Sequence, residues 1–106
     1  MVPMTRVDFH LHSTYSDGAL DPRELAQQLA VDGVAFAALT DHDSIDGLAD
    51  FRQALEQRDV GFVSGVEITV QCPDGEAHLL GYGIQPSDAE LQATLVALRQ
   101  AQAPGV

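Results

Sequence analysis

Three short β-type segments, each ending in a polar motif, constrain the fold of this chain most strongly. They cover residues 7–11, 34–39 and 60–64, and apolar residues at helical spacing follow the first two segments. Strands that alternate with helices in this way are typical of a parallel sheet with right-handed crossovers. The sequence therefore predicts an α/β fold.

Capping signals mark the helices between these strands. Asp21 followed by Pro22 predicts an N-cap and a first helical position, and Gly33 predicts the end of that helix. Ser44 or Asp46 is expected to cap a second helix that runs to about residue 57. Its buried stripe is expected to contain Leu48, Ala49, Phe51 and Leu55.

After residue 64 the pattern changes from strand and helix to two β-type segments. Residues 68–70 and 77–82 are separated by a turn sequence, Gln71-Cys72-Pro73-Asp74-Gly75-Glu76, which predicts a hairpin. A capping signature at residues 87–90 then predicts a final helix to about residue 102.

Histidines and carboxylates gather at the predicted carboxyl ends of the strands. His10 and His12 can point to one face because alternate side chains of a strand share a face. His42 follows the second strand within Thr40-Asp41-His42-Asp43, and the hairpin returns His78 toward Glu67. Functional sites of parallel sheets assemble at this edge. The sequence therefore predicts a metal site formed by His10, His12, Asp17, His42, Glu67 and His78.

Several of these residues also have a purely structural interpretation. Asp17 before Gly18 is a common turn residue, although we favour a ligand. One carboxylate of the Thr40–Asp43 motif is expected to cap or orient its neighbours, and Asp43 is a weaker candidate ligand than His42. Glu76 and Cys72 are interpreted as hairpin residues and not as ligands.

The donor types restrict the metal and the chemistry. Imidazole and carboxylate together suit zinc, manganese or iron. Glu67 lies in an apolar run, where an ionised carboxylate is costly without a cation, so a bridging position between two ions is expected. Two ions about 3.5 to 4 Å apart are suited to in-line displacement at phosphorus.

Composition limits the substrates and partners. The 106 residues leave room for one domain, residues 1–106, and carry a formal charge of −11 with no lysine. Such a charge repels long nucleic acid, so any phosphate must be held locally by metal ions. The chain has one cysteine and no apolar run long enough to span a membrane, which favours a cytoplasmic location without membrane contact.

The order of the motifs resembles the PHP (polymerase and histidinol phosphatase) family. The matching motifs are His10-Leu11-His12, Ser13 to Gly18, Thr40 to Asp43, Gly65-Val66-Glu67-Ile68 and His78-Leu79-Leu80-Gly81-Tyr82. The resemblance implies the N-terminal portion of a distorted (β/α)7 barrel with two to three divalent metal ions. It places the six candidate ligands at the family's ligand positions, with His12, Asp17, His42 and Glu67 as the catalytic set.

Within that family, the chain is most similar to stand-alone enzymes that act on small phosphorylated substrates. These remove the 3′ phosphate from nucleoside 3′,5′-bisphosphates or trim short RNA from its 5′ end. The resemblance therefore implies phosphoester hydrolysis of a nucleotide or short oligonucleotide by metal-activated water.

Alternatives to a complete phosphoesterase follow from the length of the chain. Members of the family carry further ligands downstream, whereas this sequence has no histidine after His78. The chain is thus a fragment of a longer enzyme, a short protein that completes its sheet as a homo-oligomer, or a noncatalytic metal-binding half-barrel. An amidohydrolase is less favoured because its common binuclear form uses a carboxylated lysine, and lysine is absent here.

Overall fold

The protein combines a four-stranded sheet with three helices over residues 5–102, the part of the chain that the computed structural model describes. The α/β prediction is confirmed. The elements, in chain order, are β1 (Val7–Leu11), α1 (Pro22–Val31), β2 (Phe36–Leu39), α2 (Leu48–Glu56), β3 (Gly61–Cys72), β4 (Gly75–Tyr82) and α3 (Ala89–Gln102).

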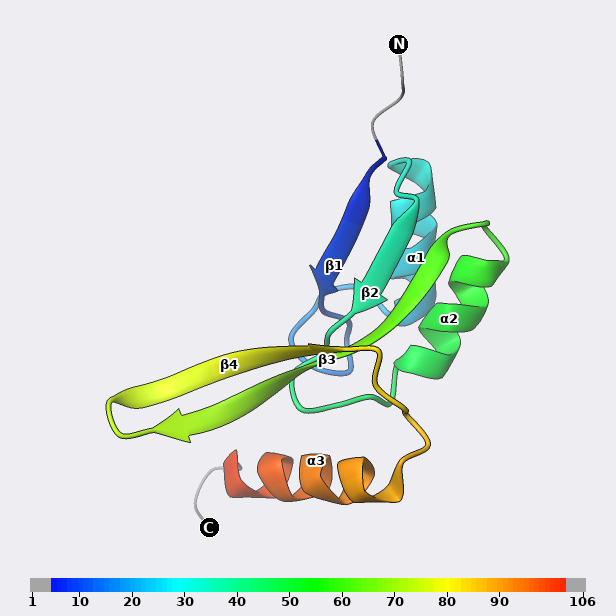
Figure 1. Cartoon of the computed structure of the whole chain (residues 1–106). Coiled ribbons are helices and arrows are strands. Elements are labelled where there is room, and N and C mark those ends of the chain that lie inside the picture. The colour runs from blue at the N-terminus through cyan, green and yellow to red at the C-terminus, as the bar shows by residue number, and fades with distance from the viewer. Residues whose placement is uncertain (1–4, 103–106) are drawn as a thin grey trace.

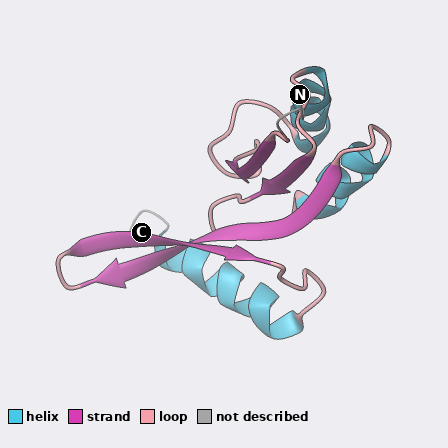
Figure 2. Cartoon of the chain, turned by 45° about the horizontal axis from the view of Figure 1, so that its top comes forward, coloured by secondary structure: helices cyan, strands magenta, loops and turns pink. Residues whose placement is uncertain are grey.

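The strands follow one another in the sheet in the order β1-β2-β3-β4. β1, β2 and the first part of β3 are parallel, and β3 pairs with β4 in antiparallel fashion. α1 and α2 lie side by side behind the parallel strands, and the hairpin of β3 and β4 projects to one side with α3 beneath it (Figure 1). The sheet is strongly curled, as Figure 2 shows from a second direction.

β3 is longer than the sequence suggested. We expected one strand at residues 60–64 and a separate β-type segment at 68–70, but a single strand runs from Gly61 to Cys72. Its first four residues pair with β2, and the next eight pair with β4 from Gly65↔Tyr82 to Cys72↔Gly75. Continuous backbone pairing therefore carries the strand through Glu67 and joins the two expected segments.

The helix starts agree with the sequence at α1 and differ at α2. Asp21 caps α1 by accepting a hydrogen bond from the backbone N–H of Glu24 at 2.8 Å, and Glu24 returns the contact, so the predicted capping box is confirmed. Neither Ser44 nor Asp46 caps α2, whose N-cap is Gly47. The Ser44 hydroxyl instead accepts from the backbone N–H of Asp46, which forms a local turn before the helix.

The hydrophobic core lies between the parallel strands and the helices. Phe51 and Leu55 of α2 are fully buried, as is Val66 of β3, and Leu95 of α3 is 1% exposed. Phe51 also meets Phe62 edge to face, with 6.3 Å between the ring centroids. The predicted stripe of α2 is correct except for Ala49, which is exposed while Ala54 is buried in its place.

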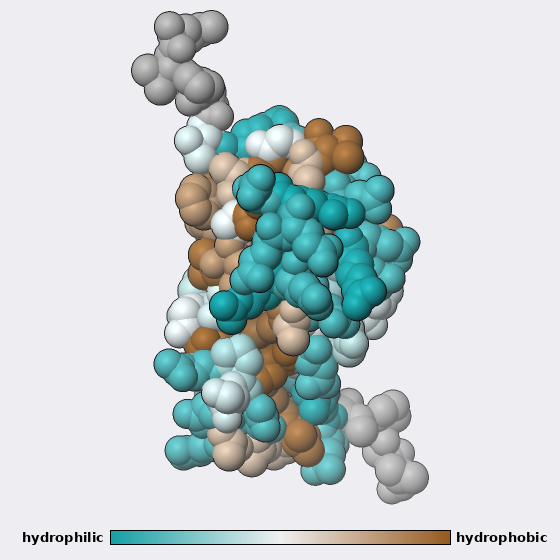
Figure 3. Space-filling model, turned by 90° about the vertical axis from the view of Figure 1, so that its right-hand side faces the viewer, coloured by the Kyte–Doolittle hydropathy of each residue, from teal (hydrophilic) through white to brown (hydrophobic). Residues whose placement is uncertain are grey.

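The molecule is elongated and exposes apolar side chains on its sheet. Its radius of gyration is 14.9 Å, compared with about 13 Å for a compact domain of this size. Leu79 of the hairpin is 58% exposed, and Val7 of the edge strand β1 is 51% exposed. In contrast, the α2 side of the molecule is largely hydrophilic (Figure 3). Among residues 5–102, no helix is long and apolar enough to cross a membrane.

Candidate metal centre

Glu67 lies at the centre of the cluster of predicted ligands. Its Oε1 atom is 2.9 Å from Nε2 of His10 and 2.7 Å from Nε2 of His12. Its Oε2 atom is 3.1 Å from Nδ1 of His78 and 3.9 Å from Nδ1 of His42. The Glu67 side chain is only 8% exposed. One buried carboxylate therefore faces the four histidines that the sequence contains.

Asp17 completes the cluster on its solvent side. Its two carboxylate oxygens lie 2.8 Å from Nδ1 of His12 and 3.2 Å from Nε2 of His42, and its side chain is 63% exposed. Within residues 5–102 the six predicted ligands thus form three overlapping groups whose donor atoms lie within 4.8 Å of one another. The groups are His10–His12–Glu67, His12–Asp17–His42 and His42–Glu67–His78.

The sheet explains how residues so far apart in sequence come together. The segment after β2 continues its parallel pairing with β3: the N–H of Glu67 donates to the carbonyl of Asp41, and the N–H of Asp43 donates to the carbonyl of Glu67. On the other side of β3, His78 pairs with Thr69, two residues from Glu67 and on the same face. His42 and His78 therefore flank Glu67 from the two neighbouring segments.

The electrostatics of Glu67 favour its ionised form. Burial by itself raises the pKa of this carboxyl, but the hydrogen bonds with His10 and His12, together with the charges of His42 and His12, outweigh burial. The net result is a pKa below the ordinary glutamate value. A carboxylate that is both buried and ionised is suited to binding cations.

The two aspartates beside His42 have positioning contacts. The Asp43 carboxylate accepts a hydrogen bond from the backbone N–H of Thr69 at 2.8 Å, and its backbone adopts a positive φ of 51°. The Asp41 carboxylate accepts bonds from the backbone and hydroxyl of Ser13 and from the hydroxyl of Ser16. We expected one of these aspartates to cap or orient its neighbours, and both accept hydrogen bonds from neighbouring segments.

Sequence reasoning missed the two serines that bind Asp41. Ser13 is fully buried although it lies in a polar loop, and Ser16 is partly buried. The only sequence signal was their presence in a loop that begins directly after His12. A serine in such a loop is usually a turn residue, so the signal was not distinctive.

Of the two hairpin residues Glu76 and Cys72, only Glu76 has a contact with a candidate ligand. One oxygen of Glu76 is 3.4 Å from Nε2 of His78, but the Glu76 side chain is 51% exposed and belongs to none of the three groups. Cys72 is exposed at the end of β3. These positions are compatible with the hairpin roles that the sequence suggested.

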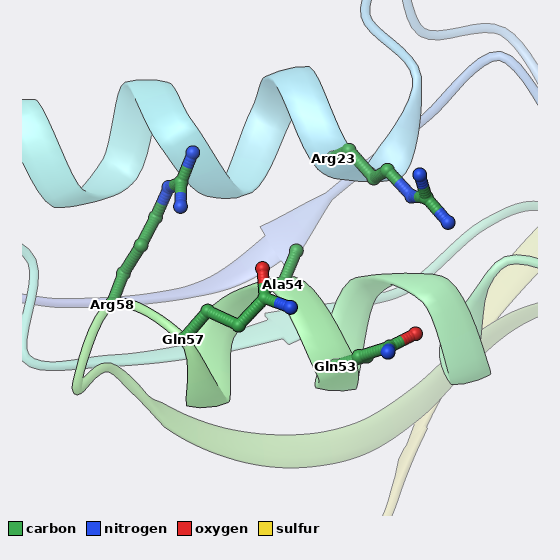
Figure 4. Close-up of a pocket in the computed structure, with 5 residues that line it drawn as sticks. All are labelled: Arg23, Gln53, Ala54, Gln57 and Arg58. Atoms are coloured by element: carbon green, nitrogen blue, oxygen red, sulfur yellow. The ribbon is translucent and has the colours of Figure 1, made fainter.

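A groove between α1 and α2 is separate from this cluster. It encloses about 220 Å³ and is lined by Arg23, Gln53, Ala54, Gln57 and Arg58. Figure 4 shows Arg23 on α1, Gln53 and Ala54 on α2, and Gln57 and Arg58 directly after α2, with strands behind them. None of these residues belongs to the three candidate metal groups.

The donor set fits divalent metal ions. Each of the three groups offers imidazole nitrogen and carboxylate oxygen, the combination that zinc, manganese and iron accept. Two of the groups share Glu67, which presents a different oxygen to each. The arrangement therefore suits ions that lie close together and share ligands.

Comparison with known proteins agrees with this geometry. The PHP domain family matches residues 8–103. The chain belongs to this family. Among relatives of this PHP chain is a 3′,5′-nucleoside bisphosphate phosphatase of Chromobacterium violaceum, 40% identical over 97 residues, which cover 92% of the chain and 34% of the relative. A 5′-3′ exoribonuclease of Haemophilus influenzae is 34% identical over 90 residues, which cover 85% of the chain and 33% of the relative.

Solved structures show the same PHP-type fold. A Chromobacterium violaceum protein named as an amidohydrolase, solved with sulfate and no metal, has a TM-score of 0.89 and 39% identity, with coverage of 92% of the chain and 34% of the other protein. A protein of Bifidobacterium adolescentis described as a metal-dependent phosphoesterase has a TM-score of 0.86 and 30% identity, with coverage of 94% and 35%. The PHP chain thus spans about a third of the length of these relatives.

Proposed function

We propose that this PHP chain provides the metal-binding part of a phosphoester hydrolase that acts on a nucleotide or a short oligonucleotide. The observation that carries the proposal is the position of Glu67, whose two oxygens face two different groups of histidines. A carboxylate shared in this way is what a multinuclear centre requires. The names of the relatives as bisphosphate phosphatase, exoribonuclease and metal-dependent phosphoesterase support the same reaction class.

The chain's own residues would hold two to three ions of manganese, zinc or iron. His10 and His78 would serve as outer ligands, and His12, Asp17, His42 and Glu67 would form the catalytic set, because each lies in the middle of the cluster or joins two histidines. Bound divalent ions would supply the charge that stabilises a phosphate group and the Lewis acidity that activates water.

The charges of the chain favour a small substrate. The chain has a formal charge of −11, which repels phosphate groups. Two or three bound divalent ions would add roughly +4 to +6 at the centre and make the local potential attractive to phosphate. Three of the five arginines have partners within the chain: Arg6 donates to the Asp32 carbonyl, Arg52 pairs with Glu56, and Arg99 donates to the Asp43 carbonyl. The other two, Arg23 and Arg58, line the separate groove between α1 and α2. The arginines of residues 5–102 therefore leave few free positive charges for a long phosphate backbone, which suits a mononucleotide or short oligonucleotide better than long nucleic acid.

The proposal is tested by metal analysis combined with phosphate release from a nucleoside 3′,5′-bisphosphate. Protein purified without chelator and supplied with Mn²⁺ is expected to bind at least two ions per chain and to release phosphate. His12→Ala is expected to abolish the release, because His12 contacts both Glu67 and Asp17. Arg52→Ala, on the outer helix layer, is the matched control and is expected to leave both measurements unchanged.

Other outcomes would support the remaining candidates. Metal binding without phosphate release would favour a noncatalytic metal-binding half-barrel. This candidate is considered because the chain spans only about a third of the length of its relatives. Hydrolysis of an amide substrate, but not of a phosphoester, would favour an amidohydrolase, the name given to one structural relative. One ion or fewer per chain would contradict the proposal of a multinuclear centre.

We also propose that the chain associates with itself when it acts alone. β1 is an edge strand, and Val7 and Phe36 on neighbouring strands are 51% and 48% exposed, which is unfavourable in water. Light scattering on the purified chain is expected to give a mass at least twice that of the 11.3 kDa monomer. Elution as a monomer of that mass at micromolar concentration would contradict self-association.

The cytoplasmic location remains a prediction from the sequence.

A further inference from the structure

Asp41 is a buried carboxylate that is linked, by its place in the sequence and by its hydrogen bonds, to residues adjoining all three members of one candidate metal group. It precedes His42 in the sequence and is 1% exposed. Its Oδ1 atom accepts from the backbone N–H of Ser13 at 2.6 Å, and Ser13 directly follows His12. The same atom accepts from the hydroxyl of Ser16, which directly precedes Asp17, at 2.8 Å.

These contacts fix the loop between β1 and α1. The Oδ2 atom of Asp41 accepts from the Ser13 hydroxyl at 2.7 Å, so the carboxylate receives three hydrogen bonds from one loop. The loop is also closed on itself, because the N–H groups of Ser16 and Gly18 both donate to the Ser13 carbonyl. At Gly18 the chain returns so near β1 that a Cβ atom would lie 2.1 Å from the His12 carbonyl oxygen.

Asp17 depends on this loop for its position because surrounding side chains do not bury it. Its side chain is 63% exposed, and its contacts are with the imidazoles of His12 and His42 alone among those described. A short, exposed loop residue holds a metal well only when its backbone is fixed, since ordering a free loop opposes binding. The bonds from Ser13 and Ser16 to Asp41 supply that order before any ion arrives.

We propose that Asp41 is a positioning residue for the His12–Asp17–His42 group, acting through the loop that carries Asp17, the member that the other two groups do not share. The hydrogen bonds of the Asp41 side chain all go to the loop between β1 and α1. The three ligands outside this group, His10, Glu67 and His78, lie on the strands β1, β3 and β4 instead. The inference rests on the proposed function, in which these groups bind metal. It adds that one of the three groups depends on a buried carboxylate that is not itself a ligand.

The test uses Ser16→Ala, which removes one bond to Asp41 at a partly buried position and preserves the core. The metal-free chain is titrated with Mn²⁺ by calorimetry. Ser16→Ala is expected to weaken one bound ion about tenfold, within the 10- to 100-fold range typical of groups that orient ligands, and to leave the others unchanged. Asp41→Ala is expected to weaken the same ion more, whereas Asp41→Asn, which retains an acceptor oxygen, is expected to restore most of the affinity.

Two comparisons assign the weakened ion. Ser16→Ala combined with Asp17→Asn is expected to be no weaker than Asp17→Asn alone, because both changes act on one group. Ser16→Ala combined with His78→Ala is expected to show the sum of the two losses, because His78 belongs to a different group. The matched control is Ser44→Ala, since the buried Ser44 hydroxyl lies near His42 but contacts Asp46 and not Asp41.

Hydrogen exchange of the metal-free chain tests the loop directly, whether or not metal binds. The loop amides of Thr14, Ser16 and Gly18 are expected to exchange severalfold faster in Ser16→Ala than in Ser44→Ala. Unchanged exchange, or an equal weakening of every bound ion, would overturn the role of Asp41. A wild-type chain that binds no Mn²⁺ but shows the faster exchange would instead contradict the proposed function and leave the loop support intact.

Discussion

Replacing Glu67 by glutamine is expected to remove metal binding from two of the three candidate groups at once. Both groups use a Glu67 oxygen, and an amide keeps one weak acceptor and places an NH₂ donor where the second oxygen faced histidines. The affinity loss for these ions is expected to exceed roughly 100-fold, the upper range for residues that only orient a ligand. Mn²⁺ titration and metal analysis after dialysis measure the effect, and phosphate release is expected to fall below detection.

Glu76→Gln is the matched control for this change. Glu76 lies on the same hairpin and contacts His78 at 3.4 Å, but its side chain is half exposed and outside the three groups. It is expected to change metal affinity by less than about threefold, as an exposed contact should. If Glu67→Gln retained the metal content of the wild type, Glu67 would not be a shared ligand and the proposed centre would need a different arrangement.

Phe51→Ala is expected to produce the largest loss of stability. Phe51 is fully buried and packs against Phe62 at the centre of the layer between helices and sheet. Truncating a buried phenylalanine costs about 3–5 kcal/mol, because hydrophobic burial is lost and a cavity remains. Since a small domain has only about 5–15 kcal/mol of total stability, the midpoint of urea unfolding is expected to fall by roughly 1–3 M or the transition to disappear.

Val31→Ala provides the comparison for that measurement. Val31 ends α1 and is 76% exposed, so its truncation is expected to change the free energy of unfolding by less than about 0.5 kcal/mol. Equal midpoints for the two variants would show that Phe51 is not in the core of the folded chain. Both variants keep all six candidate ligands, so metal content measured in parallel separates a change of fold from a change of the centre.

The parts of the fold that local sequence determines could be predicted. The α1 capping box, the individual strand segments and the hairpin turn all arise from residues within a few positions of one another, such as Asp21 with Glu24. The grouping of candidate ligands also followed from local information, because strand polarity alone brings His12 and His42 to one edge of the sheet. The structure places all six together, as the sequence analysis expected.

The parts that depend on distant partners could not be predicted. β3 continues through Glu67 because segments on both of its sides pair with it, and the pairing of Glu67 with the segment around His42 is not visible in the local pattern. The role of Asp41 depends on serines 28 and 25 positions away, at Ser13 and Ser16. The predicted N-cap of α2 was wrong for a related reason, since Ser44 is buried and its hydroxyl accepts from the N–H of Asp46 in a turn before the helix.

The length of the turn between β3 and β4 determines which face of the hairpin carries His78. Pairing of Thr69 with His78 puts the imidazole on the face of Glu67, and only Pro73 and Asp74 separate the two strands. Because side chains alternate between faces, a slip of one residue would turn His78 away from the cluster and bring Leu79 or Ala77 toward it. An insertion or deletion in this turn that shifts the register would therefore remove His78 from its candidate metal group. The length of the turn thus limits how many ions the protein can bind.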